Sequence, residues 1–573
     1  MQFVLLMFLT VVAAFAEMIS IGAVLPFLAA LTSPERVFAH PSIQPLLSIM
    51  GIGEPNELVL PLTLLFSVAA VISGAVRLTL LWVQVRLSFA VGADFAMDMY
   101  RRTLYQPYAF HLGRNSSEVI NVVSYKSTAV VGGTILPALS VIGAVVVVGT
   151  LLVGFLLVSP TVALIVMGVF GIFYALMLQL NKRKLHRNSV LLANQSTLAL
   201  KSLQEGLGGI RDVLIYGCQE VYCRMFEKAN RALRRAQGDN FLIAQSPRYV
   251  AETVGIVIMS TVVYIIAAGP EGLGFAVPFL GALALAAQRM LPAFQQAYGG
   301  VAAIRANHAS VIDVLAYLDQ PLPARPQPDS SCQMPFTSTI RLREVSFRYD
   351  SKDQQVLSNV NISIERGSRV GFIGTTGSGK STLLDLVMGL LHPAAGTIEI
   401  DGVKLDSRNA SAWQARIAHV PQAIYLSDAS IAENIAFGCL RHEVDLERVR
   451  LAASGARVDE VIDALPEGYD TLIGERGIRL SGGQRQRIGI ARALYREADV
   501  IVLDEATSAL DDDTERAVME SMESLSRHIT VLIVAHRRTT LRKCDVIVEM
   551  GAGTVKSIGS YADLIGARLE SNA

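Results

Sequence analysis

Residues 374–381 form a loop that is suited to holding phosphate groups. They read Gly-Thr-Thr-Gly-Ser-Gly-Lys-Ser, which fits the pattern G-x-x-x-x-G-K-[ST] of phosphate-binding loops. In such a loop, glycines let backbone N–H groups close around phosphate oxygens at a helix N-terminus. The glycines here are Gly374, Gly377 and Gly379. Lys380 adds positive charge beside the β- and γ-phosphates, and Ser381 offers its hydroxyl to Mg²⁺. The loop therefore predicts a nucleotide site with Mg²⁺ as cofactor.

Two carboxylates follow an apolar run at residues 500–503. They are Asp504 and Glu505, and a buried strand of a parallel sheet would present both at its carboxyl end. Asp504 should support Mg²⁺ through water. Glu505 should orient or deprotonate the attacking water. The pair therefore predicts hydrolysis of the bound nucleotide.

A strand must precede the phosphate-binding loop and a helix must follow it. Residues 369–374 have the apolar character of a strand, and residues 382–390 have the apolar spacing of a helix. This is the context that the loop needs in order to point its N–H groups at a phosphate.

A second motif, Leu-Ser-Gly-Gly-Gln at residues 480–484, lies about one hundred residues after the loop. With the loop, the Asp504–Glu505 pair and His536, it makes residues 340–567 resemble the nucleotide-binding domain of an ATP-binding cassette (ABC) protein. This resemblance implies that the nucleotide is ATP.

The resemblance implies roles for residues outside the loop. Tyr349 resembles the aromatic residue that stacks on adenine. Gln422 resembles the residue that senses the γ-phosphate and Mg²⁺, and His536 resembles the switch histidine that contacts the γ-phosphate. The expected catalytic residues are Glu505, His536 and Gln422. The expected metal site is Ser381, Gln422 and Asp504, and Thr382 joins the residues that bind the nucleotide.

In the ABC family the 480–484 motif completes the ATP site of the opposite nucleotide-binding domain. The residues that would act in trans are Ser481, Gly482, Gly483 and Gln484. Because this chain has one phosphate-binding loop and one such motif, two chains are needed. A homodimer is the simplest arrangement, and a heterodimer remains open.

The composition indicates that part of the chain lies in lipid. Hydrophobic residues make up 51% and charged residues 17%, whereas soluble proteins carry about 25% charged residues. Six apolar stretches are long enough to cross about 30 Å of hydrocarbon; they centre on 3–31, 58–83, 128–157, 160–180, 250–268 and 274–299. Residues 1–320 carry 21 Lys and Arg against 16 Asp and Glu, an imbalance too small to suggest a nucleic-acid partner.

The Lys and Arg residues predict the orientation in the membrane. They concentrate between the second and third spans and between the fourth and fifth, which should therefore be cytoplasmic. Both segments read as helical extensions of the spans, with coupling helices expected near 108–118 and 216–226. Ala14-Phe15-Ala16 resembles a signal-peptide cleavage site, but no Lys or Arg precedes it and the apolar run continues to Leu31, so a membrane span is preferred.

These observations predict a multidomain fold. An all-α transmembrane domain with six spans and long cytoplasmic extensions should occupy 1–318. A linker rich in Pro and Ser should occupy 319–339, and an α/β P-loop ABC nucleotide-binding domain should occupy 340–573. The chain resembles a type IV ABC exporter half-transporter in the bacterial cytoplasmic membrane.

Four arginines in the membrane half could recognise an anionic substrate. Charge in lipid usually faces a cavity or a partner, and the candidates are Arg77, Arg86, Arg248 and Arg289. In a dimer they would form a basic cavity suited to a pyrophosphate or another anionic head group. Snorkelling or interhelical pairing is the alternative for each.

Three stretches in the membrane half resemble bacterial lipid-linked oligosaccharide flippases; they are 14–27, 105–117 and 245–252. The resemblance implies ATP-driven outward movement of a polyprenyl-pyrophosphate glycan by alternating access. The first alternative is a general lipid, lipid A or multidrug exporter. An alternative of another class is a membrane-bound regulatory ATPase or an ATP-gated channel.

Overall fold

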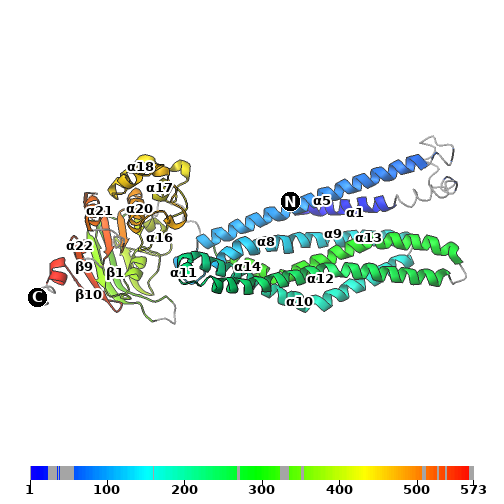
Figure 1. Ribbon diagram of the computed structural model, residues 1–573, viewed down its shortest axis with the longest axis horizontal. Coiled ribbons are helices and arrows are strands. Elements are labelled where there is room, and N and C mark those ends of the chain that lie inside the picture. The colour runs from blue at the N-terminus through cyan, green and yellow to red at the C-terminus, as the bar shows by residue number, and fades with distance from the viewer. Residues whose placement is uncertain are drawn as a thin grey trace. The chain divides into compact units, whose positions relative to one another are not determined.

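The computed structural model describes residues 2–22, 35, 38, 54, 57, 59–158, 160–267, 272–322, 334–349, 354–505, 512–524, 528–535 and 538–566. The chain divides into two compact units. We call residues 1–106 and 114–323 the helical unit, and residues 107–113 and 324–573 the α/β unit. The predicted fold class, a helical transmembrane domain followed by an α/β nucleotide-binding domain, is confirmed (Figure 1).

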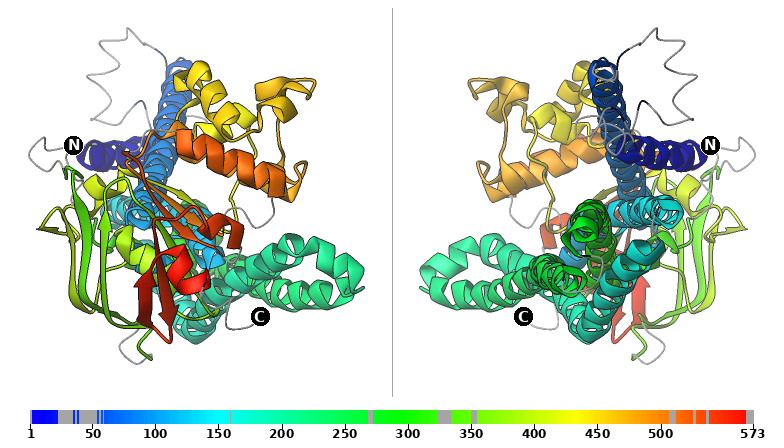
Figure 2. Two further views of the ribbon diagram at one scale, coloured as in Figure 1. Left: turned by 90° about the vertical axis from the view of Figure 1, so that its left-hand side faces the viewer. Right: turned by 90° about the vertical axis from the view of Figure 1, so that its right-hand side faces the viewer.

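The helical unit is built from long helices that lie side by side (Figure 1). Its elements are α1 (Gln2–Gly22), α5 (Val59–Leu104), α7 (Ser116–Ile120), η2 (Asn121–Lys126), α8 (Ser127–Val130), η3 (Val131–Ile135), α9 (Leu136–Val158), α10 (Pro160–Gly208), α11 (Ile210–Ile215), α12 (Gln219–Ala267), α13 (Gly272–Ala306) and α14 (His308–Leu318). The end of α10 and the start of α12, joined through α11, extend away from the rest of this unit (Figure 2).

Apolar composition explains the long helices. Among the described residues, three helical segments are long and apolar enough to cross a membrane: Gln2–Ser20, Val59–Leu104 and Ser116–Gly154. They coincide with the first three predicted spans. The other three predicted spans fall on α10, α12 and α13, where many side chains lie outside the described residues.

Pro247 lies inside α12 and interrupts its backbone hydrogen bonding. A proline has no N–H, so the carbonyl oxygen of Ile243, four residues earlier, loses its helical donor. The hydroxyl of Tyr298 on α13 donates to that oxygen at 3.0 Å. The side chain of Gln295 donates to the next carbonyl, that of Ala244, at 2.8 Å. Helix α13 therefore supplies donors where the proline has removed one.

Short helices lie in or beside the two regions predicted to hold coupling helices, and their coupling role stays a prediction. The first region, near 108–118, contains α6 (Tyr108–Leu112), which belongs to the α/β unit, and α7. The second lies earlier than predicted, at α11 rather than near 216–226. Gly217, with φ of 64°, forms the turn after α11, and α12 already begins at Gln219.

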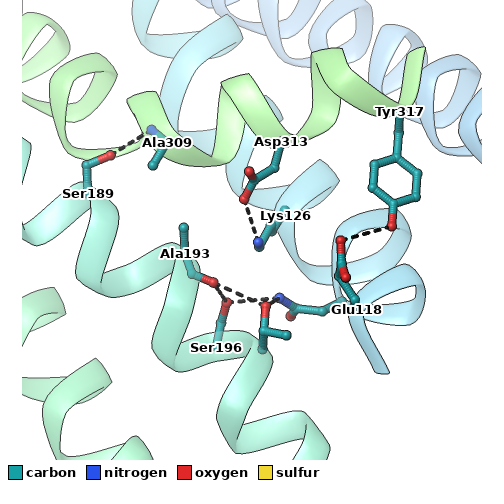
Figure 3. Close-up of polar contacts among 10 residues, drawn as sticks. Glu118, Lys126, Ser189, Ala193, Ser196, Ala309, Asp313 and Tyr317 are labelled. Atoms are coloured by element: carbon teal, nitrogen blue, oxygen red, sulfur yellow. Dashed lines mark hydrogen bonds and ion pairs between the residues drawn. The ribbon is translucent and has the colours of Figure 1, made fainter. Parts of the chain in front are cut away.

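Three polar contacts hold α14 against its neighbours in the helical unit (Figure 3). The buried Lys126 of η2 pairs with Asp313 at 2.5 Å. The Tyr317 hydroxyl donates to Glu118 at 3.4 Å, and the Ala309 N–H donates to the Ser189 hydroxyl at 2.7 Å. Helix α14 ends the helical unit just before the predicted linker, of which 323–333 lies outside the described residues.

Two sheets form the centre of the α/β unit. The antiparallel sheet has the order β2-β1-β4-β5, and the larger sheet has the order β10-β9-β3-β8-β7-β6 with only β10 antiparallel to its neighbour. The strands are β1 (Thr339–Phe347), β2 (Leu357–Glu365), β3 (Arg369–Gly374), β4 (Ala395–Ile400), β5 (Val403–Lys404), β6 (Ile417–Val420), β7 (Val500–Asp504), β8 (Thr530–Val534), β9 (Val546–Gly551) and β10 (Thr554–Gly559). Strands β3, β7 and β8 are buried and apolar, as expected for a covered parallel sheet.

The described helices of the α/β unit connect the strands or lie beside them. Besides α6 they are α15 (Lys380–Val387), α16 (Ala410–Gln414), α17 (Ile431–Ile435), η4 (Arg441–Glu443), α18 (Leu446–Gly455), α19 (Asp459–Asp463), η5 (Gly468–Asp470), η6 (Glu475–Gly477), α20 (Gly482–Tyr495), α21 (Asp512–Ser524), α22 (Arg538–Leu541) and η7 (Ala562–Gly566). Because β3, β7 and β8 run parallel, their carboxyl ends meet at one edge of the larger sheet. This edge carries the site.

Candidate nucleotide site

The phosphate-binding loop connects β3 to α15, as the sequence predicts. Close packing requires glycine at position 374, since a Cβ there would lie 2.3 Å from the carbonyl oxygen of Met550. Gly377 has open space around it, but its φ of 81° is one that other residues rarely adopt. The sequence therefore forms a tight loop that exposes N–H groups at the start of α15.

Lys380 lies at the centre of this loop and is only 8% exposed. Its Nζ donates to the carbonyl oxygens of Gly374, at 2.9 Å, and Thr375, at 3.0 Å. Burial lowers the pKa of Lys380, while the negative charges of Glu505 and Asp504 act in the opposite direction. The ammonium group is thus positioned beside two carboxylates in a partly dry site, where its attraction for a phosphate is strong.

Asp504 ends β7 and is half-buried. Burial raises its pKa, and a hydrogen bond from the Ser381 hydroxyl acts against that rise. The carboxylate and the hydroxyl are therefore side by side, as the predicted metal site requires.

The donor set fits Mg²⁺. Ser381, Asp504 and the amide oxygen of Gln422 offer oxygen atoms, which this cation prefers, and Mg²⁺ usually completes its shell with water and substrate phosphates. Among the described residues there is no group of three or more His, Cys, Asp and Glu side chains that could hold a metal by itself. A cation here would therefore depend on phosphate oxygens.

Glu505 is held in place by Gln422. The Nε2 of Gln422 donates to the Glu505 carboxylate at 2.6 Å, although the two residues are 83 positions apart in the chain. The N–H of Glu505 donates to the carbonyl of Val534 on β8 at 3.1 Å. Its φ of 50° is unusual for a residue with a side chain, and such strain is typical of functional positions. A carboxylate held this way can accept a proton from water.

Tyr349, predicted to stack on adenine, lies beside the phosphate-binding loop. Its hydroxyl forms a hydrogen bond of 2.9 Å with the hydroxyl of Thr382 on α15. Phe347 contacts it edge to face, with ring centroids 5.1 Å apart. His536 lies outside the described residues, so its role stays a prediction.

The motif at 480–484 forms the start of α20. The Ser481 hydroxyl accepts from the N–H of Gln484 at 3.2 Å, and the Gln484 side chain accepts from the N–H of Ser481 at 2.8 Å. Gly482 and Gly483 follow as the first helical residues. This reciprocal cap leaves a well-defined helix N-terminus, which favours an anion.

Asp385 was missed at the sequence level. It lies on α15 one turn after Ser381, and burial together with the charge of Asp504 raises its pKa to about 6. Its position four residues after Ser381, on the same face of a helix, is the one signal that could have indicated it.

The four candidate substrate arginines have different surroundings. Arg77 on α5 pairs with Glu17 on α1 at 2.9 Å, and Arg248 pairs with Glu252 on the same helix at 2.9 Å. Arg86 lies 5.9 Å from the centroid of the Trp82 ring. Arg289 is on α13, and its side chain lies outside the described residues. For Arg77, the structure thus contains interhelical pairing, which was one of the two alternatives to a role in substrate recognition.

Two family models match the chain. The model described as ABC transporter matches residues 357–508. The model described as ABC transporter transmembrane region matches residues 2–265. Together they cover the helical unit up to the end of α12 and the core of the nucleotide site.

Similar proteins share both parts. An ATP-dependent lipid A-core flippase of Alkalilimnicola ehrlichii is 36% identical over 372 residues, which are 63% of this chain and 61% of that protein. The chain thus spans less than two thirds of that relative. The flippase of the same name from Bordetella avium is 30% identical over 412 residues, which are 71% of this chain and 68% of that protein.

A solved structure has the same fold. A bacterial Atm1-family ABC exporter with ATP bound superposes with a TM-score of 0.75, covering 96% of this chain and 97% of that chain at 24% identity.

Proposed function

This chain belongs to the ABC transporter family, and we propose on that premise that it couples ATP hydrolysis to the export of an anionic lipid. The observation that carries the proposal is the contact between Gln422 and Glu505 at the carboxyl edge of the sheet. This contact holds Glu505, a candidate base, directly after the carboxyl end of β7. The proposed location is the bacterial cytoplasmic membrane.

Hydrolysis would proceed with each residue in a separate role. The N–H groups of the loop and Lys380 bind the phosphates and stabilise the charge that develops on the γ-phosphate. Glu505 orients the attacking water and accepts its proton, and Gln422 holds the carboxylate in position. Ser381, Asp504 and Gln422 would hold Mg²⁺, which would supply positive charge to offset the charge of the phosphates.

A second copy of the chain would complete each ATP site. The N-terminus of α20, with Ser481 as its cap, offers N–H groups and a positive dipole end to the γ-phosphate of the partner's nucleotide. Two such sites per homodimer would drive alternating access.

The proposed cargo is an amphipathic anionic lipid. The flippases that the chain resembles are named for lipid A-core, which supports a lipid exporter in general. Lipid-linked oligosaccharide is a narrower proposal, supported by the four arginines and by the resemblance of residues 14–27, 105–117 and 245–252 to flippases of such lipids. Since Arg77 and Arg248 have carboxylate partners, an anionic head group would have to compete with Glu17 and Glu252 for them.

Reconstitution in liposomes tests the proposal. Wild type should hydrolyse ATP and move one of two fluorescent lipids, a polyprenyl-pyrophosphate oligosaccharide or a lipid A-core lipid. Glu505→Gln should lose at least about 100-fold in hydrolysis while it still binds ATP. Glu520→Gln, an exposed carboxylate on α21, is the matched control and should behave as wild type.

The outcomes separate the levels of the proposal. Movement of only the oligosaccharide lipid, reduced by Arg248→Ala and Arg289→Ala, would support the narrower cargo. Movement of only the lipid A-core lipid would contradict the proposal that the cargo is a lipid-linked oligosaccharide. Undiminished hydrolysis in Glu505→Gln would contradict the assignment of the base, and ATP hydrolysis without movement of either lipid would contradict lipid export.

A further inference from the structure

Arg492 connects three segments of the α/β unit. It lies near the end of α20, and its Nε donates to the carbonyl oxygen of Asn434 at 2.9 Å. One terminal nitrogen donates to the carbonyl oxygen of Tyr425 at 3.0 Å, and the other to the side-chain oxygen of Asn434 at 3.3 Å. The guanidinium also lies over the ring of Phe437, 4.4 Å from its centroid. One planar group therefore joins α20 to the end of α17 and to the segment after Gln422.

Asn434 extends this connection. It is fully buried, and its side-chain nitrogen donates to the carbonyl oxygens of Ser427 and Ser430, each at 3.0 Å. Its side-chain oxygen accepts from the N–H of Ser427 at 3.0 Å. The acceptors of Arg492 thus belong to a network that fixes the backbone of residues 427–430.

The other end of the same segment reaches the catalytic carboxylate. Gln422 donates to Glu505 at 2.6 Å, and Tyr425, which accepts from Arg492, follows only three residues later. The chain from 422 to 427 is therefore held at Glu505 on one side and at Arg492 on the other. A shift of about 1 Å at a catalytic group can cost about 100-fold in rate, so the held backbone matters to hydrolysis.

The chemistry of the contacts calls for arginine. Burial lowers the pKa of Arg492 to about 10, which leaves it charged at neutral pH. Among the described residues no carboxylate pairs with it; its partners are two carbonyl oxygens, one amide oxygen and a ring. A half-buried charge that contacts only these neutral acceptors holds the backbone rather than neutralising an acid. A lysine would lack the planar fork that reaches all three oxygens.

We infer that Arg492 is a positioning residue for ATP hydrolysis, which fixes the backbone at Tyr425 and Asn434 so that Gln422 meets Glu505. It also ties that segment to α20, whose N-terminal cap is Ser481. This inference rests on the proposed ATP hydrolysis and adds a residue whose hydrogen bonds go to Tyr425 and Asn434.

A double-mutant cycle tests whether Arg492 acts through Gln422. Wild type, Arg492→Gln, Gln422→Ala and the double variant of the full chain are compared in nanodiscs. We measure kcat per bound ATP, so that loss of folded protein does not count, together with KM for ATP. Arg492→Gln should lower kcat about tenfold or more and change KM less than about twofold. In the Gln422→Ala background it should lower kcat no further.

Two variants guard the interpretation. Arg496→Gln is the matched control, since Arg496 lies just after Arg492, is exposed and donates to Gln414; its kcat should equal that of wild type. If Arg492→Gln binds no ATP because it does not fold, Arg492→Lys replaces it in the same cycle, with a smaller loss of kcat.

The inference fails if the losses of the two single variants multiply in the double variant, or if Arg492 substitutions raise KM more than they lower kcat. These failures require a wild type that hydrolyses ATP. A wild type without ATPase activity would instead remove the proposed function.

Discussion

At the scale of single residues, burial determines the charges around the start of α15. It lowers the pKa of Lys380 and raises those of Asp385 and Asp504. The nearby carboxylates act against the lowering of the lysine pKa. They add to the raised pKa values of the two aspartates. In this site neither the lysine nor the carboxylates are well solvated by water. The charges of a bound nucleotide and its cation would therefore be balanced mainly by these protein groups.

Asp385→Asn should change how the stability of the protein depends on pH. The pKa of Asp385 is about 6 in the folded protein, against an ordinary value of 3.8. Its contribution to stability is therefore fully present below about pH 4 and is lost as the pH rises through about 6. The melting temperature of Asp385→Asn should rise relative to wild type between pH 4 and 7.

Thermal unfolding in detergent across this pH range provides the measurement. Asp428→Asn, which replaces an exposed aspartate of the same unit, is the matched control for removal of a carboxylate. A constant difference between Asp385→Asn and wild type would show that the carboxyl titrates alike in the folded and unfolded chain.

At the scale of elements, polar side chains supply a hydrogen bond that one helix lacks and connect neighbouring helices. Tyr298 donates to the Ile243 carbonyl that Pro247 leaves without a donor. Lys126, on a π-helical segment, pairs with Asp313 of α14. Segments of π-helix are rare in proteins as a whole, but those that occur are often at functional sites. The Lys126–Asp313 ion pair therefore lies where the helix backbone is irregular.

Tyr298→Phe should destabilise the helical unit by about 1–3 kcal/mol, because a buried carbonyl loses its donor. In a Pro247→Ala background the same change should cost less, since an alanine at this position restores a backbone N–H for the carbonyl of Ile243. Chemical or thermal unfolding of the four proteins in detergent measures this coupling. Equal costs in the two backgrounds would contradict the repair of the proline site by Tyr298.

Lys126→Asp should destabilise the contact between η2 and α14, since the Lys126 side chain is only 6% exposed. In this variant the new aspartate would be a buried charge without a partner, and Asp313 would repel it. Such a change costs on the order of 3 kcal/mol. Adding Asp313→Lys should recover more than half of the loss in melting temperature. A double variant no more stable than Lys126→Asp would mean that the ion pair does not hold these elements together.

At the scale of the whole molecule, each chain carries one phosphate-binding loop and one α20 motif. If the motif acts on the partner's nucleotide, as proposed, a dimer has two composite sites. Each site then combines Lys380 of one chain with Ser481 of the other. A defect in the phosphate-binding loop would affect the nucleotide on its own chain, whereas a defect in the α20 motif would affect the partner's nucleotide.

Mixed dimers distinguish composite sites from sites within one chain. Lys380→Ala and Ser481→Arg should each abolish hydrolysis as homodimers. Co-expressed with different affinity tags, they should form a mixed dimer with one intact composite site, and ATPase activity should return. No recovery in a purified mixed dimer would show that the motifs do not act in trans.

The sequence by itself determined the features that depend on neighbouring residues. The phosphate-binding loop needs glycine at 377 because its φ of 81° is one that other residues rarely adopt, and Ser481 caps α20 through a residue three positions away. Apolar stretches predicted the long helices, and the run at 500–503 predicted β7. Motifs of this kind are readable because their geometry is set within one turn or one strand.

Only the tertiary structure decided the contacts between distant segments. Gln422 meets Glu505, Arg492 meets Tyr425 and Asn434, and Arg77 meets Glu17, over separations of 58 to 83 residues. The chain has many polar residues that could form such pairs, and packing selects among them, because a buried polar group requires a partner at hydrogen-bonding distance. The sequence identified Gln422 as a site residue, but it did not identify its contact with Glu505 or those of Arg492 with Tyr425 and Asn434.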